Sequence, residues 1–74
     1  MLEQLDFYMG KEMCFVLLGN NNKVFVKLLD NTTDYLVCRV KGFSNYYIIN
    51  IMKNKIVSFY ELDKKINNGV IQNN

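Results

Sequence analysis

The sequence contains no histidine among its 74 residues. That absence removes the side chain that most often serves as a general base near neutral pH and as a zinc ligand. The acidic residues are scattered, and only the pairs Asp30/Asp34 and Glu61/Asp63 lie close together. The first pair lacks the spacing of a calcium loop, and no glycine-rich phosphate loop is present. We therefore expect a protein that is not an enzyme and that holds no metal or other cofactor.

Cysteine is scarce, with only Cys14 and Cys38 in the chain. Both lie inside apolar runs, without the Cys-x-x-Cys spacing of a metal or redox site. This setting favours two buried free thiols, although the spacing alone leaves open a disulfide between them.

Long apolar runs are also missing. No stretch approaches the roughly 20 residues that span a bilayer, and the start of the chain lacks the charged-then-apolar pattern of a signal segment. The formal net charge is +2, with both signs distributed along the chain, which permits an anionic partner without requiring one. We expect a soluble, cytoplasmic protein with no membrane partner.

The sequence does contain short apolar runs with a period of two, separated by polar turns. Leu2, Leu5 and Met9 have helical spacing and predict a short amphipathic N-terminal helix over residues 1–9. Five strands are expected after it, over residues 11–18, 23–29 and 35–41, then after the turn at 42–45 and after the turn at 52–55. These elements predict a mostly β fold, a small closed or nearly closed barrel over residues 1–62. Residues 63–74 are expected to form a polar, flexible tail.

The last two strands are apolar on both faces, and their short polar connection predicts a hairpin. One face carries Tyr46, Ile48, Ile56 and Tyr60, and the other carries Tyr47, Ile49, Ile51, Val57 and Phe59. A small antiparallel sheet ordinarily has one dry face and one wet face, and no proline blunts these strands against pairing. A core of this size contributes little net stability without disulfides, metal or oligomerisation. Another copy of the chain is therefore the expected cover for the excess apolar surface.

The order of these elements resembles the Sm-like (Lsm and Hfq) family. The likeness runs over residues 2–62 and is carried by four segments, at residues 8–12, 19–23, 30–34 and 53–59. It implies a short N-terminal helix followed by a five-stranded antiparallel Sm-like (SH3-like) barrel. In that family the fourth strand of one subunit pairs with the fifth strand of the next, which closes a homo-oligomeric ring. The interface residues would then be Tyr47, Ile49, Ile51, Val57 and Phe59. Other small barrels, of the SH3-like, Tudor and KOW types, remain alternatives.

The same resemblance implies binding of single-stranded RNA, in the manner of an RNA chaperone. In Sm-like rings, the loop after the second strand and the loop between the fourth and fifth strands line a central pore. Here the first loop would offer amide and hydroxyl groups to a base edge, and the second would offer cations to phosphates and an amide to a base or sugar. Tyr35 would be a candidate for stacking. The implied RNA-binding residues are Asn31, Thr32, Thr33, Tyr35, Lys53, Asn54 and Lys55.

An alternative function has no nucleic acid in it. A small barrel from a mobile element that serves as a protein-interaction or structural module would have much the same sequence. The modest net charge, the acidic residues beside the 30–34 loop, and the absence there of the family's usual ligand spacing favour this alternative.

Overall fold

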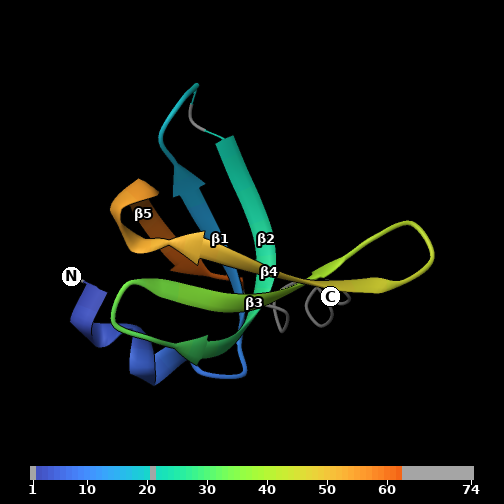
Figure 1. Ribbon diagram of the computed structural model, residues 1–74, viewed down its shortest axis with the longest axis horizontal. Helices are drawn as coiled ribbons and strands as arrows, with labels where there is room; N and C mark the ends of the chain where they lie inside the picture. Colours follow the sequence, from blue (N-terminus) through green and yellow to red (C-terminus); the bar gives the residue numbers. More distant parts are fainter. Residues whose placement is uncertain (1, 21, 63–74) are drawn as a thin grey trace, which may run out of the picture.

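The computed structural model describes residues 2–20 and 22–62 of the chain (Figure 1). Its elements, in chain order, are η1 (Leu2–Tyr8), β1 (Glu12–Leu17), β2 (Asn22–Asn31), β3 (Tyr35–Lys41), β4 (Tyr46–Met52), η2 (Lys53–Lys55) and β5 (Ile56–Glu61). The mostly β class and the five strands are confirmed. The tail predicted for residues 63–74 lies outside the described residues.

The five strands form one antiparallel sheet in the order β4-β3-β2-β1-β5. The predicted hairpin between the last two strands is therefore wrong, because β4 and β5 lie at opposite edges of the sheet. Between these two strands in the chain, η2 carries the backbone from one edge of the sheet to the other (Figure 1). Within the described residues β4 and β5 do not pair, so the sheet is not closed.

The N-terminal segment is a 3-10 helix, which corrects the α-helical spacing expected from the sequence. A 3-10 helix has three residues per turn, so Leu5 and Tyr8 share a side and Met9 does not. Leu5 is fully buried, whereas Met9 is exposed. Tyr8 packs edge-on against Phe59, with 5.8 Å between ring centroids. The helix thus covers one end of the sheet with residues three apart.

One face of the sheet carries the core. The strands β2 and β3 contribute alternating buried side chains, as their period of two predicts. In β1, three consecutive residues, Met13, Cys14 and Phe15, are all buried. Two register shifts interrupt this alternation, one in β2 between Leu28 and Asp30 and one where β1 meets β5 near Leu17. Such bulges increase the local twist of a strand. The buried core cluster consists of Leu5, Met13, Phe15, Val26, Leu28, Leu36, Cys38 and Ile51.

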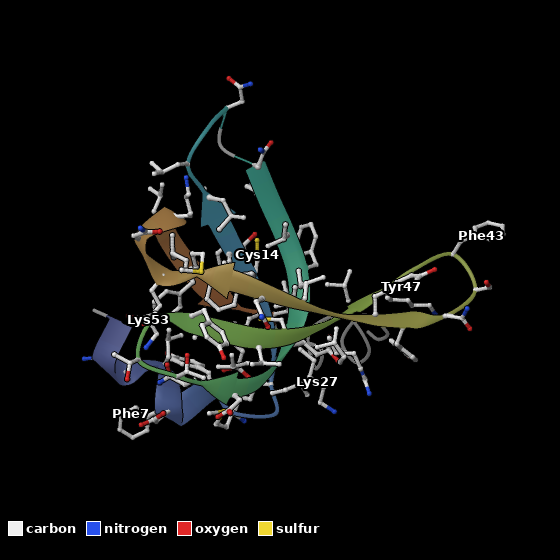
Figure 2. All side chains as sticks on the ribbon, in the orientation of Figure 1. Phe7, Cys14, Lys27, Phe43, Tyr47 and Lys53 are labelled. Atoms are coloured by element: carbon white, nitrogen blue, oxygen red, sulfur yellow. The ribbon has the colours of Figure 1, made fainter. Side chains whose placement is uncertain are left out.

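Two tight turns follow the predicted chemistry. In the β1–β2 turn, Gly19 and Asn20 have φ values of 91° and 56°, which glycine and asparagine tolerate best. In the β3–β4 turn, the Gly42 N–H donates to the Asn45 carbonyl at 2.7 Å. A Cβ atom at Gly42 would overlap the Tyr47 ring and lie 2.9 Å from the Asn45 carbonyl oxygen. The β3–β4 hairpin extends from the rest of the sheet as an arm (Figures 1 and 2), and within it the Tyr47 ring packs directly against Gly42.

Candidate functional site

The two loops that the sequence assigned to RNA lie side by side. The Lys53 N–H donates to the Asp34 carbonyl at 2.9 Å, which joins η2 to the loop between β2 and β3. Lys53 is half-buried, and the Asn54 and Lys55 side chains are exposed. We refer to residues 31–35 and 53–55 together as the loop surface.

Within the loop surface, local hydrogen bonds occupy part of the predicted ligand set. The Thr32 hydroxyl donates to the Tyr35 carbonyl at 2.7 Å and accepts from the Tyr35 N–H at 3.1 Å. The Asn31 side-chain amide donates to the Asp6 carboxylate at 2.8 Å. Thr32 therefore closes the turn, and Asn31 ties the loop to η1. Thr33 is exposed at the tip.

The Asn31 side-chain oxygen of the loop surface accepts no hydrogen bond from the described residues. The same oxygen is buried. A buried acceptor without a donor is costly, on the order of 1–3 kcal/mol, so this oxygen favours any donor that reaches it. Acidic and basic residues both lie near it, because the Asn31 amide donates to the Asp6 carboxylate and the Asp34 carbonyl accepts from the Lys53 N–H.

The predicted interface residues fall into two groups. Ile51 is only 5% exposed and belongs to the core, while Ile49 and Phe59 are half-buried against it. Tyr47 and Val57 are exposed. Their own chain thus already covers much of the first group. On β4, Tyr46 and Ile48 are exposed as well, and Ile48 is 60% exposed.

One side of the β4 backbone pairs with no other strand in the described part of the chain. Hydrogen-bonded and non-hydrogen-bonded pairs alternate along an antiparallel ladder. The Gly42–Asn45 and Asp34–Lys53 pairs at its two ends are both hydrogen-bonded, and the register between them is unbroken. The alternation therefore turns four residues of β4 so that their N–H and C=O groups point away from β3: Tyr46, Ile48, Asn50 and Met52.

Among residues 2–20 and 22–62, one side of the β5 backbone is likewise unpaired. The Leu62 N–H donates to the Glu12 carbonyl at 2.9 Å, and the register then runs evenly to the bulge. By the same alternation, the N–H and C=O groups of Phe59 and Glu61 point away from β1. The sheet thus ends in two strands that each offer a row of backbone groups for pairing.

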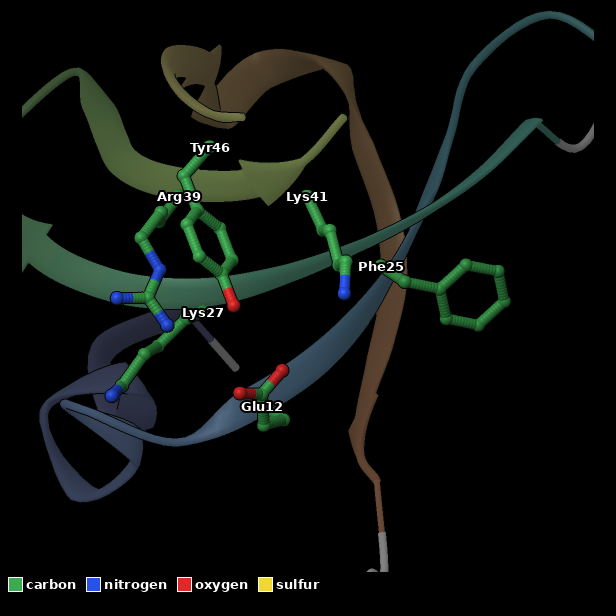
Figure 3. Close-up of a pocket in the computed structure, with 6 residues that line it drawn as sticks. All are labelled: Glu12, Phe25, Lys27, Arg39, Lys41 and Tyr46. Atoms are coloured by element: carbon green, nitrogen blue, oxygen red, sulfur yellow. The ribbon is translucent and has the colours of Figure 1, made fainter. Parts of the chain in front are cut away.

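A second cluster of functional side chains lies on the face of the sheet opposite the core. An open hollow of about 320 Å³ is lined by Glu12, Phe25, Lys27, Arg39, Lys41 and Tyr46 (Figure 3). The Arg39 guanidinium lies 4.2 Å from the centroid of the Tyr46 ring, within the range of a cation–π contact. We call these six residues the outer-face cluster.

The alternation along residues 35–41 predicts that Arg39 and Lys41 share one face of their strand, but it does not bring the rest of the cluster to them. The structure does so through register, because Lys27 is opposite Arg39 and Tyr46 is opposite Lys41. The signal available in the sequence was the alternation along β2, where Phe25 and Lys27 interleave with apolar core residues. It carried no register, so the neighbours across the strands were missed.

Both cysteines are buried and free, as the sequence favoured. Burial raises the pKa of the Cys38 thiol from 9.0 to about 11. Cys14 is in register with Phe25 on one side and Tyr60 on the other. The hydrogen bond between Tyr60 and Cys14 raises the pKa of the Tyr60 hydroxyl, and desolvation adds to the effect.

Comparisons with known proteins give no family for this chain. No protein-family model matches it, and neither a curated protein nor a solved structure does. No helix in residues 2–20 and 22–62 is long and apolar enough to cross a membrane. Among the same residues, no three acidic, cysteine or histidine side chains gather where they could hold a metal ion.

Proposed function

We propose that this chain is an Sm-like protomer that forms a homo-oligomeric ring through its β4 and β5 edges and binds single-stranded RNA at the loop surface. Assembly and RNA binding are separate parts of the proposal. The first is supported by the strand edges and the second by the neighbouring loops.

The observation that carries the proposal is the pair of open edges on one sheet. Unpaired edge strands invite association with other chains, and here both edges carry exposed apolar side chains, such as Ile48 on β4 and Val57 on β5. The strand order β4-β3-β2-β1-β5 leaves free the two strands that pair between neighbouring subunits in the Sm-like family. Head-to-tail pairing of β4 with β5 of the next copy closes a ring and leaves no edge exposed.

RNA binding is supported by what closure of the ring would do to the loop surface. Each protomer presents Lys53 beside the β2–β3 loop and Lys55 two residues further, where its carbonyl accepts from the Leu18 N–H, and a ring repeats this pair in every copy. Repetition can raise avidity about 10²–10⁴-fold over a single weak site. The exposed Thr33 hydroxyl can donate to a base, whereas the Asn31 side-chain oxygen is buried and can accept from one only after the loop opens. The Thr32 hydroxyl already donates its proton within the turn, so toward a base it can only accept.

The test combines native mass spectrometry with nucleic-acid retention. We expect the purified protein to be a closed oligomer and to release bound RNA as salt is raised, because the lysines contact phosphates. Replacing Lys53 and Lys55 together by alanine should weaken binding of a labelled oligo(U) or oligo(A) strand while the oligomer stays intact. Lys23→Ala, at the opposite end of β2, is the matched control and should change neither property.

A protein-interaction function without RNA is the second candidate, and a specific observation favours it. The Asp6 carboxylate is bonded to Asn31 and Asp34 is bonded through its backbone to Lys53, so the loop surface carries acidic residues as well as lysines. An intact oligomer that retains no RNA at low salt would support this candidate and reject the RNA-binding part of the proposal. A monomer at tens of micromolar would reject the ring.

A further inference from the structure

The outer face of the sheet carries an organised group of cations and aromatic rings that the loop surface does not use. Lys27, Arg39 and Lys41 come from two neighbouring strands and share the hollow with a single carboxylate, that of Glu12 (Figure 3). Their charge therefore favours an anionic ligand. Phe25 and Tyr46 lie at the same hollow, and more than half of each side chain is exposed.

We propose that this outer-face cluster is a second contact surface for single-stranded RNA, with phosphates held by the cations and a base stacked on the Arg39–Tyr46 pair or on Phe25. The proposal rests on the proposed function in one respect, that the ligand of this protein is RNA. It differs in naming residues outside the loop surface.

The stacked pair gives the surface its specificity for a nucleotide over a simple anion. The Arg39 guanidinium, held 4.2 Å from the Tyr46 ring centroid, is already placed as a flat cationic platform. Bases of unpaired RNA stack on aromatic rings and on arginine planes. A positively charged groove interleaved with such platforms is the pattern by which proteins hold single strands.

The cluster is far enough from the loop surface to be tested separately. Tyr35 begins β3 at the loop surface, and Lys41 ends the same strand at the arm. Six residues at about 3.3 Å each separate them by roughly 20 Å. A strand of several nucleotides is needed to reach both, and a single nucleotide can occupy only one.

Two double variants distinguish the surfaces: Lys27→Ala with Lys41→Ala, and Lys53→Ala with Lys55→Ala. The measurement is fluorescence anisotropy of a labelled oligo(U) strand at several salt concentrations. Each lost phosphate contact lowers the slope of log affinity against log salt by about 0.7 for a single strand. We expect the Lys27/Lys41 variant to lose roughly 1.4 of this slope and at least tenfold in affinity.

A second measurement asks where the bases lie. Ultraviolet crosslinking to an oligo(U) strand carrying 4-thiouridine, followed by peptide mapping, should mark the peptides that contain Phe25 or Tyr46. Phe25→Leu keeps an apolar side chain but removes the ring, and we expect it to reduce affinity by about five- to hundredfold if it stacks a base. Uridine monophosphate serves as the competitor. Displacement of the labelled strand at millimolar uridine monophosphate would show that the surface binds a free nucleotide, and no displacement would show that it requires a polynucleotide.

The outcomes separate this inference from the proposed function. Unchanged slope and crosslinking in the Lys27/Lys41 variant, with loss of binding in the Lys53/Lys55 variant, would overturn the inference and leave the function standing. Loss in the Lys27/Lys41 variant alone would support the outer face and reject the loop surface. A wild-type oligomer that binds no strand at low salt would reject both.

Discussion

Replacing Ile48 by proline is the sharpest test of assembly, because the structure gives this residue an unused N–H group. The alternation of hydrogen bonds along β4 turns the Ile48 N–H away from β3, so proline there removes no bond among residues 2–20 and 22–62. Proline is accepted on an edge strand when the missing N–H faces outward. The protomer should therefore stay folded, while pairing with the β5 edge of another copy loses a donor.

The expected magnitude follows from two terms. Ile48 is 60% exposed, and burying a whole isoleucine side chain contributes about 1.5–3 kcal/mol, so its share at a subunit contact is about 1–2 kcal/mol. One lost interstrand hydrogen bond adds about 0.5–1.5 kcal/mol. Together they weaken each contact by about 1.5–3.5 kcal/mol, or roughly 10- to 300-fold in its dissociation constant.

The assay is analytical ultracentrifugation at micromolar concentration, with circular dichroism to follow folding. We expect Ile48→Pro to sediment as the 8.7 kDa chain with an unchanged spectrum. Ile48→Thr keeps the N–H and loses only apolar surface, so its degree of association should lie between those of the parent protein and Ile48→Pro. An assembled Ile48→Pro variant, indistinguishable from the parent protein, would refute the assignment of β4 as a pairing edge.

Three further changes test the protomer itself. Leu5→Ala empties a fully buried site and should lower the free energy of unfolding by about 2–5 kcal/mol. Phe7→Ala, on the exposed side of the same helix, should change it by less than about 0.5 kcal/mol. Denaturant titration compares the two variants. Because folding raises the pKa of Cys38 from 9.0 to about 11, the unfolded thiol ionises first, and stability present below pH 9 is lost as the pH rises to 11. Cys38→Ala should remove this contribution to the slope, at most about 1.4 kcal/mol per pH unit, and leave that of Tyr60, whose pKa folding also raises. Gly42→Ala should lower the free energy of unfolding by about 1–3 kcal/mol, because the added Cβ overlaps the Tyr47 ring. A thermal melt in which the variant matches the parent protein would show instead that the arm shifts to make room.

The strands were predictable because each is bounded by residues that turn the chain. The third strand was placed at residues 35–41, which are its bounds in the structure. The second runs further than predicted, to Asn31, because its polar last residues still pair with β3. Local propensity does not foresee that pairing, since asparagine and aspartate favour turns when considered alone.

The larger error concerned the partner of each strand. A short polar gap between two apolar runs predicts a hairpin, yet residues 53–55 lead to the far edge of the sheet. No local sequence signal distinguishes a turn that reverses the chain into a neighbouring strand from one that connects the two opposite edges of a sheet. The outer-face cluster was missed for the same reason, because Lys27 and Arg39 meet only through register.

The crossing at η2 also limits the shape that the sheet can take. From Met52 to Ile56 the chain has four steps, which reach at most about 14 Å, whereas five strands laid flat would hold their outer members about 19 Å apart. The sheet must therefore curl until its outermost strands approach, and the span of this short tether governs how tightly it curls. In the proposed ring, adding glycines there should relax the curvature and change the angle between neighbouring copies. The length of one three-residue segment would then decide how many copies close the circle.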